Sequence, residues 1–416
     1  MIRLKIKLAF LKAILDLYLK AIEVSSKEIL GAVSIRLGRP KYNGNSGIQT
    51  KQIAFDEFLI TFDIDIDTPM LPDNILLSSN LVKDLQDFLN QKKYSSLAVL
   101  VDENTHRYCY PLIQDALPQH FLISVRSGEA EKNIDTSVEI WKAMTDHGLD
   151  RHACVLVLGG GVLGDMGGFC AATYKRGIDF ILIPTTLLAQ VDASIGGKLG
   201  VDFNHFKNHI GVFQKPVLTL LYGGFLKTLP EAELRSGFAE IIKHSLISDE
   251  EMWKEISTRP LKQQDWKKLI KHSVEFKAWI TTEDPKEKGL RKILNAGHTI
   301  GHALESYLLA KANRILHGEA IAVGLITEGF IAKSQGYLTE AALKDICSFI
   351  VNIYGKVRIE KEDLDSIAQL TLQDKKNKGN KILCVLLDGI GKAKWDCEIS
   401  LESVKEALSF YRTIQI

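Results

Sequence analysis

The sequence predicts an α/β protein with a doubly wound nucleotide-binding domain followed by a mainly α-helical C-terminal domain. From about residue 97, short apolar or β-branched runs alternate with helix-length segments, which is typical of βαβ units and a mostly parallel sheet. After Thr228 these runs give way to segments whose apolar residues recur at helical spacing. The 416 residues, 46% apolar and 25% charged, provide material for two or three globular domains.

The expected strands precede Thr228, and each is followed by Gly or polar turn residues. They comprise residues 97–101, 121–125, 154–158, 180–183 and 218–221. Thr228 and Glu231 form a capping-box pattern that predicts the start of the first C-terminal helix, and Pro230 is acceptable in a first turn. The expected helices comprise residues 234–247, 266–280, 290–308, 320–332 and 343–353.

A hairpin and a last helix are expected near the C-terminus, because residues 381–387 and 393–399 flank the turn Asp388-Gly389. We therefore divide the chain into an N-terminal extension of unknown role (1–70), a nucleotide-binding α/β domain (71–227) and a mainly helical domain (228–416).

The N-terminal extension is basic, with ten Lys and Arg against three Asp and Glu in residues 1–51. Leu8, Leu11, Leu15 and Leu19 have the spacing of an amphipathic helix. Charged residues interrupt this apolar stretch and no small-residue cleavage site follows, so we expect no secretory leader.

The composition excludes several classes of partner. A net charge of +1 provides no overall attraction to nucleic acid or to anionic lipid. No apolar run reaches the ~18 residues needed to span a bilayer. The six cysteines are scattered, without a CxxC pair, and several lie in apolar runs, which favours small buried hydrophobes over disulfides or a zinc knuckle. We therefore expect a soluble protein of the reducing cytoplasm.

A glycine-rich run, GGGVLGD at residues 159–165, follows the expected strand at 154–158. Its backbone amides could approach a pyrophosphate at a helix N-terminus, but a tight strand-to-helix turn without any ligand explains the pattern equally well. Thr185 and Thr186 follow the next strand, at the same carboxyl edge of a parallel sheet. Since ligands bind at that edge, they favour a nucleotide site.

Basic residues near glycine provide candidates for binding an anion. Lys198 lies in the run DASIGGKLG at residues 192–200, and Lys207-Asn208 follows. Glycines admit a ligand close to the backbone and Lys contributes a point charge, although a solvated loop remains an equal alternative. Lys277, Arg291 and the pair Lys375-Lys376 are individually unremarkable.

Histidines provide candidates for a metal site. His298 and His302 lie four residues apart in NAGHTIGH (295–302), so a helix places them on one stripe with Asn295 and Glu305. Histidine pairs at this spacing also occur without metal. Two histidines and a carboxylate with a free position make a catalytic zinc site, and Glu240 could supply the carboxylate. The spacing does not decide which two of four histidines are ligands: His244, His298, His302 and His317.

Taken together, these motifs resemble the 3-dehydroquinate synthase family in order and spacing, from about residue 97 to 376. The resemblance implies a homodimer with its active site between the two domains, NAD that is used and regenerated within one turnover, and a divalent metal, Zn²⁺ or Co²⁺. The implied reaction converts a small sugar phosphate, 3-deoxy-D-arabino-heptulosonate 7-phosphate, to 3-dehydroquinate and phosphate. Neither nucleic acid nor a membrane is implied as a partner.

The resemblance also implies roles for single residues. Glu240, His298 and His317 match the metal ligands, so His302 becomes a substrate- or proton-handling residue. The positions matching NAD contacts are Asp102, Gly128, Glu129, Lys132, Gly161, Gly164, Asp165, Thr185, Thr186, Lys198, Lys207, Phe225 and Thr228. The positions matching the substrate side are Lys198, Asn208, Lys243, Lys277, Arg291, Asn295, His302 and one of Lys375 and Lys376. Arg176 resembles an arginine that reaches the phosphate across the dimer interface.

Three alternatives are weighed against this function. Another sugar-phosphate cyclase, making an inosose or a valiolone, is disfavoured by Asn295 and His302. A metal-dependent polyol dehydrogenase of similar fold would not need the Lys198 loop or Arg291. A binding protein without activity requires a broken site motif, and none is visible. Arg291 and Asn295 would share one helical face if the helix extends back past Leu294.

Overall fold

The computed structural model describes residues 71–204, 206–373 and 381–415, together with the backbone of three strands nearer the N-terminus. The chain divides into two compact units, Met1–Pro69 and Met70–Ile416. In the first, β1 (Ile35–Leu37), β3 (Phe58–Phe62) and β2 (Lys51–Phe55) form an antiparallel sheet in that order. The helix expected from Leu8 to Leu19 and the pair Lys375-Lys376 lie outside the described residues.

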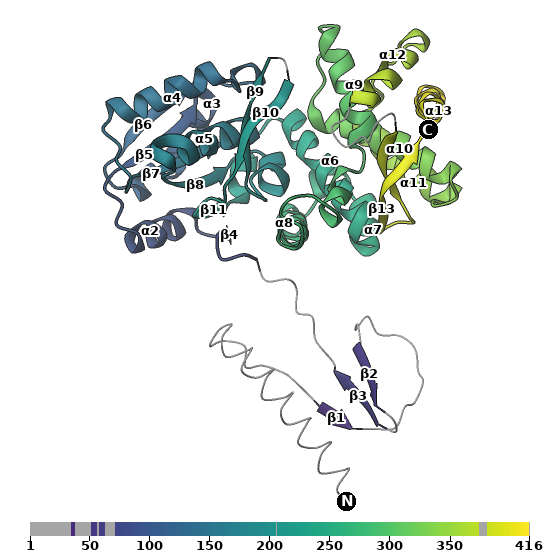
Figure 1. Cartoon of the computed structure of the whole chain (residues 1–416), viewed down its shortest axis with the longest axis horizontal. Helices are drawn as coiled ribbons and strands as arrows, with labels where there is room; N and C mark the ends of the chain where they lie inside the picture. Colours follow the sequence, from purple (N-terminus) through teal and green to yellow (C-terminus); the bar gives the residue numbers. More distant parts are fainter. Residues whose placement is uncertain are drawn as a thin grey trace, which may run out of the picture. The chain divides into compact units, whose positions relative to one another are not determined.

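The second unit contains a six-stranded sheet in which every paired neighbour is parallel (Figure 1). The five strands expected from the sequence are confirmed within one or two residues, and the edge strand β4 was not predicted because it has only three residues. In spatial order the strands are β4 (Ile75–Leu77), β11 (Leu218–Leu221), β8 (Asp179–Pro184), β7 (Cys154–Gly159), β5 (Leu97–Asp102) and β6 (Phe121–Val125).

Helices cover both faces of this sheet, which confirms the doubly wound architecture. Alternate residues of β5 enter different cores, because successive strand side chains point to opposite faces. Ala98 and Leu100 pack with α4 (Ile134–Asp146) and α5 (Gly161–Thr173). Val99 and Val101 pack with α2 (Leu81–Gln91) and the segment after α3 (Glu103–Tyr108).

The C-terminal half is mainly helical, as expected (Figure 1). Helix α10 (His317–Ser334) runs through its core and packs against several neighbours. The expected hairpin is confirmed as β12 (Ile382–Leu387) paired with β13 (Ala393–Ile399). The other helices are α6 (Glu231–Ser248), α7 (Glu250–Ser257), α8 (Trp266–Glu283), α9 (His298–Ala310), α11 (Glu340–Tyr354), α12 (Leu364–Leu370) and α13 (Leu401–Thr413).

The expected helix over 290–308 is wrong in its first third. Leu290–Asn295 forms a 3₁₀ helix, and α9 begins only at His298, after Gly297 adopts a left-handed φ of 77°. A 3₁₀ helix turns 120° per residue, so residues four apart do not share a face. Arg291 and Asn295 therefore do not lie on one helical stripe, and Asn295 is separated from the stripe of His298 and His302.

The capping box expected at Thr228 is also wrong. Helix α6 begins at Glu231, and its N-cap is Pro230, which offers no side-chain hydrogen bond. A residue before proline is disfavoured in helical conformation, so Leu229 cannot be part of a helix that would start at Thr228. Thr228 instead ends the preceding 3₁₀ turn, Gly223–Lys227, and its hydroxyl donates to Phe225 O at 3.4 Å.

An antiparallel hairpin was not expected. Strands β9 (Lys198–Phe203) and β10 (Phe206–Phe213) pair where the sequence suggested a glycine loop, and Figure 1 shows them between the sheet and the helical half. A Cβ on Gly211 would lie 2.2 Å from Leu199 O, so the tight strand contact requires glycine there. Lys198 is thus held at the first residue of a strand.

The cysteines are free thiols, and all but the half-buried Cys397 are buried, which confirms their interpretation as small buried hydrophobes. Within the described ranges, no helix is both long enough and apolar enough to cross a membrane.

Candidate active site

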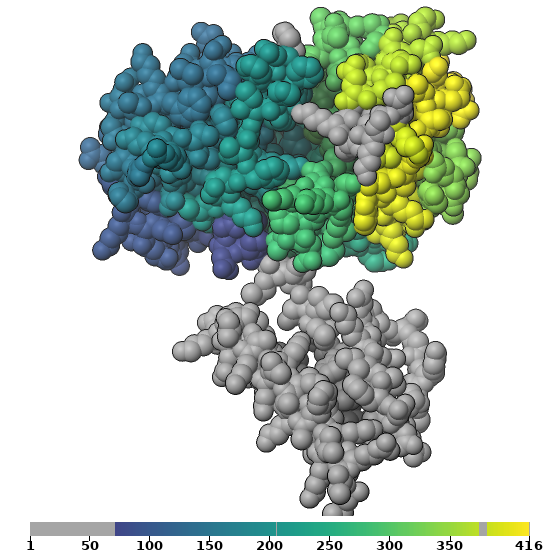
Figure 2. All heavy atoms as spheres, in the orientation of Figure 1, coloured from purple at the N-terminus to yellow at the C-terminus, as the bar shows by residue number. Residues whose placement is uncertain are grey.

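The candidate site lies where the β9–β10 hairpin, the first turn of α5 and the helical half meet. Figure 2 shows the surface hollowed between the teal and green parts of the second unit. Two ion pairs connect the α/β half to the helical half. Lys207 of β10 pairs with Glu305 of α9 at 2.8 Å. Asp192, in the π-helix Ala189–Ala193, pairs with Lys277 of α8 at 2.5 Å. The residues that the sequence singled out fall into three groups around this region.

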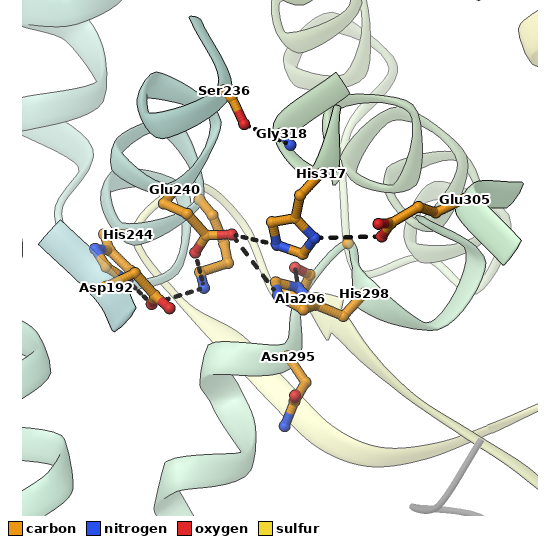
Figure 3. Close-up of polar contacts among 12 residues, drawn as sticks. Asp192, Ser236, Glu240, His244, Asn295, Ala296, His298, Glu305, His317 and Gly318 are labelled. Carbon is orange, nitrogen blue, oxygen red and sulfur yellow. Dashed lines mark hydrogen bonds and ion pairs between the residues drawn. The ribbon is translucent and has the colours of Figure 1, made fainter. Parts of the chain in front are cut away.

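The first group surrounds the fully buried Glu240 of α6. Its Oε1 lies 3.5 Å from Nε2 of His317 and 3.7 Å from Nε2 of His298 (Figure 3). Among the described residues, this buried oxygen has the two imidazoles at ion-pair distance and accepts no hydrogen bond. The cluster therefore combines a carboxylate oxygen and two imidazole nitrogens that face one another.

Both histidines are oriented through their other ring nitrogen. His298 Nδ1 lies 2.9 Å from Ala296 O, and His317 Nδ1 lies 3.4 Å from Glu305 Oε2. In the neutral form of each ring, acceptors at Nδ1 place the proton there and leave Nε2 as a lone-pair donor, the usual arrangement around metal-binding histidines. A donor set of two histidines and one carboxylate, with an otherwise unsatisfied buried oxygen, fits a divalent metal such as Zn²⁺ or Co²⁺.

The electrostatics of this group favour the metal-binding forms of Glu240 and His298, whereas His317 must lose a proton to bind a metal. Burial raises the pKa of Glu240, but the Lys243 ammonium and the two imidazoles outweigh it and hold that pKa well below its usual range. Burial, with Lys243 nearby, keeps the pKa of His298 well below its ordinary value, so this ring is neutral. Burial lowers the pKa of His317, but the neighbouring carboxylates of Glu240 and Glu305 raise it to about 9, so metal binding there releases a proton.

The other two histidines differ in environment. The exposed ring of His302 has its centroid 5.0 Å from that of His298 and 5.6 Å from that of His317. His244 is fully buried, and neither ring nitrogen has a hydrogen bond to any part of the chain that the structure describes. Burial lowers its pKa to about 3. It belongs to a second cluster with Asp192 and Glu240. The ammonium of Lys277 lies 2.5 Å from Asp192 Oδ1, so this second cluster already contains a positive charge, which disfavours a metal ion there.

The second group surrounds Glu287, a residue that the sequence did not single out. Its carboxylate bonds to Lys198 Nζ and accepts from Asn295 Nδ2 at 2.7 Å. Asn295 points away from the histidines in Figure 3. Arg291 is buried and has Glu287 as a charged neighbour. It donates to Pro285 O at 2.9 Å and contacts Gly196 O at 3.5 Å. The second group therefore unites Lys198 of β9 with Glu287 of the loop after α8 and with two residues of the 3₁₀ helix, Arg291 and Asn295.

The third group lies at the glycine loop. Lys132 is buried and donates to Asp165 Oδ2 at 2.6 Å and to Asn208 Oδ1 at 2.7 Å. Asn208, which was expected to contact the substrate, thus bonds to Lys132, which was expected to contact NAD. Helix α5 has Gly160 as its N-cap and no side-chain cap, so its first amides can bind an anion. A Cβ on Gly160 would lie 2.9 Å from Thr186 Cγ2, which accounts for glycine there.

The remaining predicted residues line the same sheet edge or lie apart from it. Asp102 ends β5 and accepts from Thr105 N at 2.8 Å as the cap of α3, while the Thr185 amide donates to Gly159 O at 3.0 Å. Lys207 also lies 3.6 Å from Glu129, which follows Gly128. Phe225 is buried and Thr228 exposed. Arg176 is exposed with a left-handed φ of 71°, and its role across an interface stays a prediction.

Sequence reasoning missed Asp192 and Glu287 as site residues, and it placed Glu305 on the histidine stripe without giving it a role. Asp192 lay inside the quoted run at residues 192–200, and its carboxyl group near predicted cations was the available signal. Glu287 belongs to no motif, and only its contacts with Lys198 and Asn295 show it.

Comparison with known proteins decides the family. The 3-dehydroquinate synthase N-terminal family model matches residues 122–236, and the C-terminal model matches residues 237–377. The 3-dehydroquinate synthase of Parabacteroides distasonis is 38% identical over 348 residues, which cover 82% of this chain and 99% of that protein. The chain belongs to the 3-dehydroquinate synthase family. The enzyme of the same name from Leptospira interrogans is 41% identical over 68% of this chain and 79% of its own length.

Solved structures share the fold of this 3-dehydroquinate synthase family member. The 2-epi-5-epi-valiolone synthase of Streptomyces hygroscopicus, solved with NAD⁺ and Zn²⁺, matches with a TM-score of 0.73 and 26% identity, over 82% of this chain and 97% of that one. A 2-deoxy-scyllo-inosose synthase complexed with carbaglucose-6-phosphate, NAD⁺ and Co²⁺ matches with a TM-score of 0.70 over 87% and 99% of the two chains. At 24% identity the latter shows the fold alone.

Proposed function

We propose that this chain is a 3-dehydroquinate synthase, which converts 3-deoxy-D-arabino-heptulosonate 7-phosphate to 3-dehydroquinate and phosphate. The overall reaction combines a transient oxidation, elimination of phosphate, re-reduction and an intramolecular aldol closure. The observation that carries the proposal is the buried Glu240 facing His298 and His317, with the Lys243 ammonium beside it, in a chain of this family. Curated relatives of this name are 38% to 41% identical.

The residues present fit both cofactors of the reaction. When bound, NAD supplies a hydride acceptor and donor, and a divalent metal supplies a Lewis acid. Glu240, His298 and His317 would hold the metal. The glycine loop at Gly161 and Gly164 would hold the pyrophosphate of NAD, with Lys132 and Asp165 beside it. The solved valiolone synthase with NAD⁺ and Zn²⁺ supports this pair of cofactors.

The cationic side chains recognise an anionic substrate. The heptulosonate phosphate carries a carboxylate and a phosphate, and Lys198, Lys243, Lys277 and Arg291 offer four positive charges. In the structure the three lysines pair with the carboxylates of Glu287, Glu240 and Asp192, so a lysine that binds the substrate exchanges its carboxylate partner for an anionic group of the substrate. The exposed His302, beside the metal cluster, is assigned to holding or moving a proton of the substrate.

Other functions are less well supported. A different sugar-phosphate cyclase shares the fold, but Asn295 and His302 and the names of the curated relatives favour 3-dehydroquinate synthase. A polyol dehydrogenase has no use for so many cations around an uncharged substrate. Every predicted site side chain among the described residues has the chemical type that its proposed role requires, which disfavours an inactive binding protein.

We further propose a cytoplasmic homodimer in which Arg176 reaches the phosphate bound by the partner subunit. Free cysteines accord with a reducing compartment. The domain boundaries at residues 70 and 227 are proposed as well, with NAD held in 71–227 and metal and substrate held mainly in 228–416.

The deciding experiment incubates the purified chain with the heptulosonate phosphate, NAD⁺ and Zn²⁺ or Co²⁺. We expect release of one phosphate per dehydroquinate and no lasting rise of NADH absorbance, because oxidation and reduction cancel. NADH that accumulates in proportion to substrate consumed would identify a dehydrogenase. Faster turnover of sedoheptulose 7-phosphate or glucose 6-phosphate would identify another cyclase.

The nucleotide group gives a prediction about stability as well as binding. Lys132→Met leaves the Asp165 carboxylate without its cation, so we expect a loss of about 3 kcal/mol in unfolding free energy. We also expect weaker NAD⁺ binding, measured by calorimetry. Lys207→Met removes an exposed cation and should cost no more than ~1 kcal/mol of stability while still weakening NAD⁺ binding. Unchanged NAD⁺ affinity in both variants would contradict the assignment of this group.

A further inference from the structure

Helix α9, which begins with the proposed metal ligand His298, has no cap within its own sequence. Its N-cap residue is Gly297, which has no side chain and a left-handed φ of 77°. The first amides of an α-helix lack intrahelical partners and must find acceptors elsewhere. This start of α9 is buried, so water is not the acceptor for Gly297, Thr299 and Ile300.

Glu328, from the middle of α10, supplies the acceptors. Its Oε2 accepts from Gly297 N at 2.6 Å, and its Oε1 accepts from Thr299 N at 2.9 Å and Ile300 N at 3.1 Å. The side chain is buried, and Glu328 is 3% exposed. A carboxylate at the positive end of a helix, bonded to backbone amides, is a favourable charge-assisted contact.

A glycine one helical turn earlier makes this contact possible. A Cβ on Gly324 would lie 1.8 Å from Gly297 O, so α10 can approach the start of α9 only because residue 324 is glycine. Gly324 and Glu328 are four residues apart and share one face of α10. Helix α10 begins with the proposed metal ligand His317. The same helix also carries Glu328, whose carboxylate caps α9, the helix that begins with the other histidine ligand, His298.

We propose that Glu328 is a positioning residue for the metal site, which holds the first turn of α9 and thereby sets His298 against Glu240 and His317. His298 is bracketed by the amides that Glu328 binds, and its Nδ1 contacts Ala296 O in the same turn. The proposal rests on the metal site described under the proposed function. A shift of this turn moves His298 directly and leaves His317 and Glu240 in place.

The test replaces Glu328 by Gln, which keeps the shape but turns an amide donor toward one backbone N–H. We expect Zn²⁺ affinity, measured by chelator competition, to fall about tenfold or more, as for other partners of metal ligands. The visible spectrum of the Co²⁺-loaded protein should change as well. Wild-type Zn²⁺ affinity and an unchanged Co²⁺ spectrum would overturn the proposal.

The matched control is Thr327→Val, which removes a buried hydroxyl from the neighbouring residue of α10. Thr327 bonds only within its own helix, to Val323 O and Gly324 O among the described contacts. Its Zn²⁺ affinity should stay within twofold of wild type, and a loss equal to that of Glu328→Gln would overturn the proposal. If Glu328→Gln does not fold, Glu328→Asp withdraws the carboxylate by one methylene, and wild-type Zn²⁺ affinity there would also overturn it.

His298→Ala separates this inference from the metal assignment. If His298→Ala retains Zn²⁺, the proposed ligand set itself is wrong. If His298→Ala loses Zn²⁺ while Glu328→Gln keeps it, only the positioning role fails. In the His298→Ala background, adding Glu328→Gln should lower the residual Zn²⁺ affinity by less than twofold, because the two residues act through one ligand. Equal losses in both backgrounds would show that Glu328 acts on general stability.

Discussion

His317→Ala should abolish metal binding and activity together. Its Nε2 is one of two imidazole nitrogens that face the buried Glu240 oxygen, and two ligands alone hold a divalent cation weakly. The loss of Zn²⁺ affinity should exceed the 10- to 100-fold, in rough terms, that a partner outside the ligand set costs. Elemental analysis after dialysis, with a phosphate-release assay on the same sample, measures both effects.

His302→Ala is the control for that experiment. This ring lies beside both proposed ligands but at the exposed side of the cluster. We expect full metal content and a reduced kcat, by about 100-fold if His302 moves a proton. Full metal in His317→Ala would show that the proposed ligand set is wrong, and a metal-free His302→Ala protein would show that the set is built on the His298–His302 pair.

Asn295→Asp should reduce kcat/KM strongly although the change is nearly isosteric. The Asn295 amide donates to Glu287 at 2.7 Å, and Glu287 also binds Lys198. An aspartate there places two carboxylates in contact, diverts Lys198 from the substrate and repels its anionic groups. Loss of one charge-assisted hydrogen bond, about 1.5 to 3 kcal/mol, corresponds to roughly a 10- to 150-fold decrease.

Asn352→Asp makes the same chemical change on the exposed surface of α11 and should leave kcat/KM unchanged. Circular dichroism confirms that both variants fold. If Asn295→Asp turns over the heptulosonate phosphate at the wild-type rate, the group around Glu287 does not face the substrate. The resemblance would then have misassigned Lys198 and Asn295 together.

Local patterns in the chain are sufficient for much of the fold and for part of the site. Strands such as β5 and β7 are short apolar runs with a polar or glycine end, and helices such as α8 show their periodicity in any window of three turns. The glycine loop at Gly161 and the histidines at 298 and 317 are recognisable because their chemistry depends on residue type and order. These features need no information about distant segments.

Contacts between distant segments decide the rest. The histidine spacing left four candidates, and only the approach of α6 to α9 and α10 brings Glu240 to His298 and His317. Glu287 acquires its role from Lys198, 89 residues away, and Glu328 acquires its role from the amides of α9. The break at Gly297 has the same origin, because α10 packs against it at Gly324. A local sequence pattern predicts which side chains lie on each face of a segment. Packing between segments determines which charged side chains meet and which backbone groups those side chains bind.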